Sequence, residues 1–104
     1  EDARANLRDF PWVSTRTSRV DAKLATWEPG DVIVADPPRT GLGQDLARTL
    51  AEGRARRVVL ISCDPAAMAR DVAAMVEAGR RVVSMNSIDM FPNTHHFEVV
   101  TALA

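Results

Sequence analysis

Hydrophobic residues are concentrated in four short runs that are rich in β-branched side chains. Valine and isoleucine recur in DVIVAD (31–36), RVVLISC (57–63), RRVVSMNSIDM (80–90) and FEVVTALA (97–104). Such residues favour strands because they pack well on a pleated surface. A continuous apolar run is typical of a strand that is covered on both faces. We therefore predict four strands, with 31–36 and 57–63 buried on both faces of a sheet.

Two segments between these runs have the pattern of helices. Residues 44–52 suit a short helix that ends at a glycine, and residues 64–79 form the clearest helical segment of the chain. In the second segment Asp64 can cap the first turn, Pro65 suits that turn, and Gly79 closes the helix. Its apolar stripe, which we interpret as core packing, consists of Met68, Val72, Met75 and Val76.

The first thirty residues give weaker signals. Residues 1–10 have the spacing of the second half of a helix, which Pro11 would stop, and no start signal precedes it. We therefore expect that the chain begins inside a longer protein. Residues 11–20 indicate a short strand and loop, and residues 21–27 one or two helical turns.

The order of these elements predicts the fold class. Strands that alternate with helices imply right-handed crossovers and a parallel sheet. The last two strands have no helix between them, so we expect them to pair antiparallel at one edge. The sequence thus predicts an α/β fold, mostly parallel, with an antiparallel final strand.

Composition narrows the class of protein further. The chain has 104 residues, 46% hydrophobic and 26% charged, which suits at most one globular domain. Its single cysteine excludes an internal disulfide framework, and a reducing cytoplasm fits best. No apolar run approaches the roughly 20 residues that a membrane-spanning helix needs. The net charge of −1 does not indicate a polyanion partner. The arginines of the second half either form solvated surface or contact nucleic acid: Arg54, Arg56, Arg57, Arg70, Arg80 and Arg81.

Polar residues follow three of the predicted strands at the point where each strand ends. Asp36 ends the first strand, Cys63 and Asp64 end the second, and the segment DMFPNTHHFE (89–98) follows the third. Ligands of open α/β sheets bind outside the carboxyl ends of the strands. The sequence therefore predicts a functional site at this edge.

Two interpretations of Cys63 remain open on these grounds. A free cysteine is often an inert, buried thiol. The position of Cys63 just before a helix favours the second interpretation, because the helix dipole there stabilises a nucleophilic thiolate. Asp64 opposes this effect with its negative charge unless its carboxylate caps the helix.

The other candidates also have two interpretations each. Asp36 either shapes the loop PPRTGLG (37–43) or accepts a hydrogen bond from a ligand, and Arg39 is either a surface charge or a phosphate contact. Glu98 stands in an otherwise apolar strand, where it is either an exposed edge residue or a buried acid suited to proton transfer. His95, His96 and Glu98 suggest a metal site, but this segment supplies no third ligand at a convincing spacing. We therefore predict no metal site.

Three blocks of sequence together resemble the RNA uracil carbon-5 methyltransferases. These blocks, DPPRTGLG (36–43), SCDPAAMARD (62–71) and DMFPNTHHFEVV (89–100), occur in the order and spacing of that family. The resemblance covers nearly the whole chain. It implies an S-adenosylmethionine-dependent enzyme with a Rossmann-like sheet that makes 5-methyluridine in transfer or ribosomal RNA. Residues 1–104 would then form the C-terminal portion of its catalytic domain.

The resemblance also assigns roles to three residues. It implies that Cys63 is the nucleophile, that Glu98 is the catalytic base, and that Asp36 contributes to the methyl-donor site. Carbon 5 of uracil is a poor nucleophile, so a thiolate must first add to carbon 6, and a base must later remove the proton from carbon 5. The target base would have to be flipped out of its stack.

The sequence departs from the family pattern in one respect, which limits what the chain can do alone. Two other functions also remain open. The family's Gly-rich donor-binding loop and its N-terminal regions are absent from these 104 residues. We therefore expect the chain alone to bind S-adenosylmethionine poorly and to be inactive. The alternatives are another S-adenosylmethionine-dependent methyltransferase, acting on adenine nitrogen or cytosine, and a non-catalytic RNA-binding module. Oligomeric state and the presence of an iron–sulfur cluster elsewhere in the protein stay open.

Overall fold

A computed structural model describes residue 10, residues 31–88 and residues 98–104 of the chain. The described elements follow in the order β1 (Val32–Ala35), α2 (Gln44–Glu52), β2 (Arg57–Ser62), α3 (Pro65–Glu77), β3 (Val82–Ile88) and β4 (Glu98–Leu103). The four predicted strands and the two predicted helices are thus confirmed, with ends that are trimmed by a few residues. Apart from Phe10, the predictions for residues 1–30 lie outside the described residues, as does the loop 91–96.

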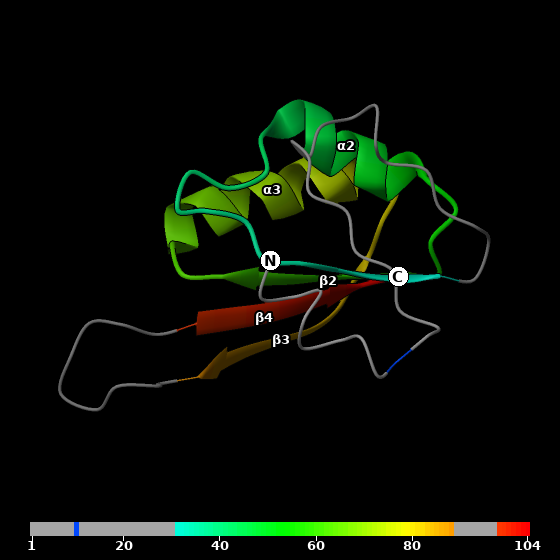
Figure 1. The fold of residues 1–104 in the computed structure, drawn as a ribbon. Helices are drawn as coiled ribbons and strands as arrows, with labels where there is room; N and C mark the ends of the chain where they lie inside the picture. Colours follow the sequence, from blue (N-terminus) through cyan, green and yellow to red (C-terminus); the bar gives the residue numbers. More distant parts are fainter. Residues whose placement is uncertain (1–9, 11–30, 89–97) are drawn as a thin grey trace, which may run out of the picture.

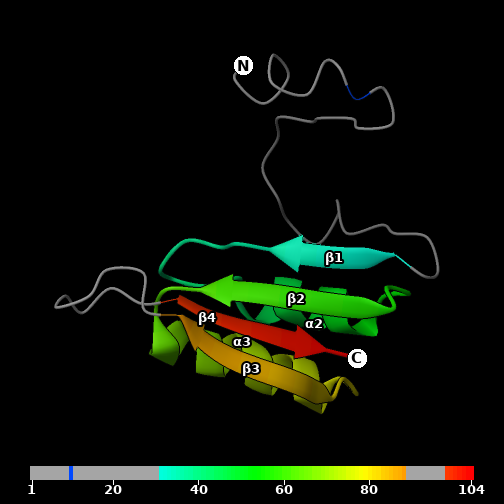
Figure 2. The same cartoon turned by 90° about the horizontal axis from the view of Figure 1, so that it is seen from below.

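The four strands form one sheet in the order β1-β2-β4-β3 (Figure 2). β1 and β2 are parallel, and β4 is antiparallel to both of its neighbours, β2 and β3. The predicted antiparallel pairing of the last two strands is confirmed, with β3 at the edge. The sheet is mixed, as predicted: β1, β2 and β3 run in one direction and the final strand β4 runs in the opposite one. Because β4 lies between β2 and β3, two of the three ladders are antiparallel.

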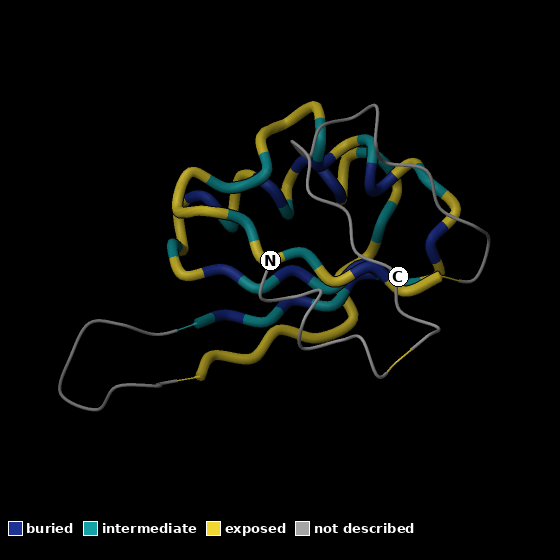
Figure 3. The backbone as a smooth tube through the Cα atoms, in the orientation of Figure 1, coloured by how far each residue is buried: buried dark blue, intermediate teal, exposed yellow. Residues whose placement is uncertain are grey.

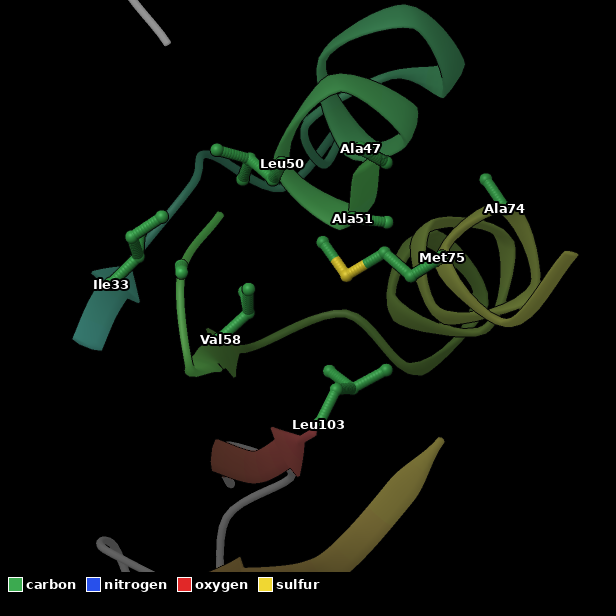
Figure 4. Packing of buried hydrophobic residues seen from close by; sticks show 9 residues of the cluster. Ile33, Ala47, Leu50, Ala51, Val58, Ala74, Met75 and Leu103 are labelled. Atoms are coloured by element: carbon green, nitrogen blue, oxygen red, sulfur yellow. The ribbon is translucent and has the colours of Figure 1, made fainter. Parts of the chain in front are cut away.

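Both helices cover the same face of the sheet (Figure 1). Val58 of β2 and Leu103 of β4 point toward them, and Met75 of α3 reaches between the two helices and the sheet (Figure 4). Small side chains let α2 and α3 approach closely: Ala47, Ala51 and Ala74 are all buried. Burying a side chain of the size of Met75 contributes roughly 1.5–3 kcal/mol to stability.

The opposite face of the sheet is uncovered in the described part of the chain. In β2 and β4 every second residue is buried (Figure 3). Val32 and Val34 of β1 are 48% and 62% exposed. The prediction that 31–36 and 57–63 are buried on both faces is therefore wrong. Continuous apolar runs indicate strands that can be covered twice, and here the described helices lie on one side only.

The helix α3 begins and ends as its sequence predicts. The carboxylate of Asp64 accepts hydrogen bonds from the backbone N–H groups of Ala66 and Ala67, at 2.9 and 3.4 Å. Gly79 follows the helix with a φ of 112°, and the N–H of Arg80 donates to the Met75 carbonyl at 3.0 Å. A positive φ at this position suits glycine because it has no Cβ.

The predicted apolar stripe of α3 is partly wrong. Met75 is fully buried, but Val76 is 46% exposed, and the buried face of the helix includes the polar residue Asp71. The buried residues are Ala67, Asp71, Ala74 and Met75. Within the described residues, no helix has the length and hydropathy that crossing a bilayer would need.

Candidate functional site

The register of β2 and β4 brings two of the predicted site residues together. Ser62 of β2 pairs with Val99 of β4, in the last pair of their antiparallel ladder. Cys63 follows Ser62 and Glu98 precedes Val99, so these two residues are the next positions on neighbouring strands. Directly opposite residues of an antiparallel pair have Cβ atoms about 4.5–5.5 Å apart. The side chains of Cys63 and Glu98 are therefore expected to be close neighbours.

Asp36 lies at the same end of the sheet, where β1 and β2 have their carboxyl ends. β1 runs parallel to β2, with Ala35 paired to Leu60, so Asp36 directly follows the end of β1 beside the end of β2. Asp36 is exposed and its carboxylate has no hydrogen-bond partner in the described residues. The predicted convergence of Asp36, Cys63 and Glu98 on one edge is therefore confirmed as a placement.

Cys63 is exposed at the start of the α3 segment. The interpretation of this cysteine as an inert, buried thiol is thereby wrong. The carboxylate of Asp64, which could oppose a thiolate, is engaged in capping α3. The N-terminal end of a helix carries a partial positive charge that stabilises a nearby anion. The structure therefore places an accessible thiol directly before the N-cap of α3.

Glu98 is half-buried at the first position of β4, and it pairs with Ile88 of β3. Its Oε2 atom is buried and has no hydrogen-bond partner within the described part of the chain. A buried carboxylate oxygen without a partner is costly, so such groups in native proteins call for an explanation. One explanation that suits a half-buried acid is that this oxygen accepts a proton from a substrate.

The remaining candidates are less informative. Arg39 is exposed in the loop after β1, as are Arg54, Arg56, Arg70 and Arg81 elsewhere on the surface. His95 and His96 lie outside the described residues. Residues 31–88 and 98–104 contain no group of three or more His, Cys, Asp or Glu side chains that could hold a metal ion.

One buried charge at this edge was missed by the sequence analysis. Asp71 of α3 is only 3% exposed, and its carboxylate accepts hydrogen bonds from the backbone N–H groups of Leu42 and Gly43, at 2.8 and 3.3 Å. Its spacing from Ala67 and Met75 contained the signal. An acid four residues after one buried helical position and four before another lies on the buried face, and it needs a partner there.

Solved structures show what this architecture is similar to. The fold matches the crystal structure of a Pyrococcus abyssi tRNA (uracil-54, C5)-methyltransferase in complex with S-adenosyl-L-homocysteine, with a TM-score of 0.75 and 30% identity. That match covers 98% of this chain and 25% of the Pyrococcus chain. A putative methyltransferase from Thermoplasma acidophilum shares the fold, with a TM-score of 0.64 and 16% identity over 97% of this chain and 50% of that chain. The fold is therefore an α/β fold that occurs in methyltransferases.

Sequence comparisons narrow this class to one family. The model of the tRNA (uracil-5-)-methyltransferase family matches residues 3–104. An uncharacterized RNA methyltransferase from Streptomyces avermitilis is 40% identical over 99% of this chain and 24% of its own length. Another uncharacterized RNA methyltransferase, from Enterococcus faecalis, is 47% identical over 70% of this chain and 16% of its own length. The chain belongs to the tRNA (uracil-5-)-methyltransferase family, and it spans no more than about a quarter of these two relatives.

Proposed function

We propose that these residues form part of the catalytic domain of an RNA methyltransferase that modifies carbon 5 of a uridine in tRNA or rRNA. The pairing of Ser62 with Val99 is the observation that carries this proposal. It supports a site in which a thiol and a carboxylate act on one substrate base from neighbouring strands. The described sheet would then be the C-terminal portion of a Rossmann-like sheet.

Asp36 is the residue that we assign to the methyl donor. Its carboxylate is exposed at the end of β1 and has no partner in the described residues, so it is available to accept hydrogen bonds from a ligand. Ligands of open α/β sheets bind at this edge, which supports the assignment. S-adenosylmethionine, when bound, supplies a methyl group on a positively charged sulfur, and Asp36 would hold and orient that molecule.

Cys63 would open the reaction. Its thiolate adds to carbon 6 of the uracil ring, which moves electron density to carbon 5 and makes that carbon nucleophilic. The exposure of Cys63 supports this role, because a nucleophile must be accessible to its substrate.

Glu98 would close the reaction. Once carbon 5 carries its new methyl group, the proton on that carbon must leave before the ring can regain its double bond. A carboxylate of Glu98 takes this proton, and the bond between Cys63 and carbon 6 then breaks with return of the thiolate. The unpartnered Oε2 of Glu98 supports this role, because it is an acceptor that no described residue uses.

An RNA that contains 5-fluorouridine tests the proposal. The experiment uses the intact enzyme that contains these residues, with S-adenosylmethionine and either tRNA or rRNA substrates. Fluorine at carbon 5 cannot leave as a proton, so the reaction should stall as a covalent protein–RNA adduct on a denaturing gel. We expect the adduct in the wild type and none in Cys63→Ala.

A control variant tests whether any substitution in the α3 segment abolishes the adduct. Ala78 and Cys63 lie at opposite ends of the α3 segment, and an Ala78→Ser variant should keep the adduct. A wild-type enzyme that binds S-adenosylmethionine but forms no adduct with any uridine-containing RNA would contradict the proposal. Methylation of adenine nitrogen by that enzyme would then favour the alternative activity, which needs no cysteine.

We expect these 104 residues alone not to catalyse methyl transfer to RNA. They contain no Gly-rich donor-binding loop, so the affinity for S-adenosylmethionine depends on other parts of the enzyme. We expect the isolated chain to show no methyl transfer to RNA that the intact enzyme modifies. Measurable transfer by the isolated chain would contradict this part of the proposal.

A further inference from the structure

The loop that follows β1 carries the two exposed charges Asp36 and Arg39. Neither side chain has a hydrogen-bond partner in the described residues. Their positions therefore depend on how the backbone of the loop is held. Within the loop, the N–H of Gly41 donates to the Pro38 carbonyl at 2.8 Å, which closes a turn around Arg39.

Asp71 holds the other end of this loop from a different element. Its carboxylate accepts from the consecutive N–H groups of Leu42 and Gly43, at 2.8 and 3.3 Å. Gly43 is the residue that precedes the first turn of α2, and it makes no side-chain cap of its own. The carboxylate of Asp71 thus also lies at the positive end of the α2 dipole. These interactions compensate the burial of its charge.

The loop conformation is shaped to fit this carboxylate. Gly41 and Gly43 have φ values of 84° and 88°, which side chains other than hydrogen rarely allow. A Cβ atom built on Gly41 would lie 2.7 Å from Oδ2 of Asp71, well inside contact distance. The backbone therefore approaches Asp71 as closely as only glycine permits.

Asp71 also belongs to the helix that Cys63 leads into. α3 begins at Pro65, immediately after Cys63 and Asp64, and Asp71 lies in the same helix. Its hydrogen bonds therefore connect the segment that carries Cys63 to the loop that carries Asp36. We propose that Asp71 is a positioning residue, which sets the methyl-donor contact of Asp36 relative to the nucleophile. This inference rests on the proposed function of Asp36 and Cys63.

Asp71→Asn in the intact enzyme is the primary test. Asparagine keeps the shape of the side chain, but it offers one oxygen and an NH₂ group where the two backbone N–H groups need two acceptors. We expect the amides of Leu42 and Gly43 to exchange with deuterium faster than in the wild type. We also expect the Kd for S-adenosylhomocysteine, measured by titration calorimetry, to rise roughly tenfold, which corresponds to the loss of about one hydrogen bond to a charged group.

The kinetic constants distinguish positioning from a purely structural role. A misplaced donor contact should raise the KM for S-adenosylmethionine, while kcat at saturating donor stays within about twofold of the wild type. Asp45→Asn is the matched control, because Asp45 is exposed in the first turn of α2 and neighbours the same loop. It should change neither constant.

Gly41→Ala provides a second variant if Asp71→Asn does not fold. It keeps the buried charge but forces the loop and the carboxylate apart, so it should raise the same Kd. A Kd within about twofold of the wild type in both variants, together with faster amide exchange, would overturn the proposal and leave Asp71 a structural residue. A wild-type enzyme that binds no S-adenosylhomocysteine would overturn the donor assignment of Asp36 itself, so the two failures are distinguishable.

Discussion

Ser62 and Val99 face each other across the last pair of the β2–β4 ladder. This single pairing fixes the relation between two segments that are far apart in the sequence, because the register of an antiparallel ladder sets every neighbouring position. A shift by one residue would move Glu98 away from the position next to Cys63. The arrangement of the candidate site thus depends on the register of the β2–β4 ladder as well as on the identity of Cys63 and Glu98.

Replacement of Glu98 by glutamine should trap the reaction on ordinary RNA. The amide cannot take the proton from carbon 5, so the Cys63 adduct should form and persist after methyl transfer. We expect turnover to fall by roughly 10²–10⁴-fold, the usual contribution of a general base. Mass spectrometry of the adduct should find one added methyl group. Glu77→Gln, at the exposed end of α3, is the control and should turn over normally.

Loss of the α3 cap should lower stability. Asp64→Ala removes the acceptor of the Ala66 and Ala67 amides, which should decrease the free energy of unfolding by about 1 kcal/mol. Asp64→Asn keeps an acceptor oxygen at that position and should be close to the wild type. Urea denaturation of both variants measures the difference. Equal stabilities of the two variants would show that the cap contributes nothing.

Arg80 should stabilise the end of α2. Its guanidinium donates to the carbonyls of Ala51 and Gly53 at 2.8 and 3.2 Å, where the helix leaves acceptors without partners. We expect Arg80→Ala to lower the free energy of unfolding by roughly 1–2 kcal/mol. Arg81→Ala removes an exposed side chain next to it and should cost about 0.5 kcal/mol at most. Thermal unfolding of the two variants provides the comparison.

Two methionines should respond very differently to truncation. Met75 is fully buried between the helices and the sheet, so Met75→Ala should destabilise the fold by about 2–5 kcal/mol. Met85 is 50% exposed on β3, and the same substitution there should cost much less. Chemical denaturation of both variants measures the contrast. A loss at Met85 as large as that at Met75 would contradict the described core.

Local sequence signals predicted the elements well, because their causes are local. The β-branched runs, the Asp64 cap and Gly79 act within a few residues, and the structure confirms each of them. The common edge of Asp36, Cys63 and Glu98 was also predictable, since strand direction alone determines which ends meet. The chemical roles of these residues remain predictions.

Long-range partners explain what the sequence analysis missed. The spacing of Asp71 from Ala67 and Met75 indicates a buried carboxylate, but it does not indicate that the partners are amides 28 and 29 residues away. Likewise, Val32 and Val34 are as apolar as core residues, and only the placement of both helices on one face exposes them. Insertion of β4 between β2 and β3 follows from sheet topology, which residue patterns within single strands do not encode.

The central place of β4 has a consequence for folding during synthesis. β3 leaves the ribosome before β4, yet the described sheet holds β3 only through its ladder with β4. Until residues 98–103 are available, β3 has no described strand to pair with, and its seven exposed residues stay unpaired. The sheet is therefore completed from the inside, and a nascent chain that stalls before Glu98 would expose an unpaired strand open to aggregation.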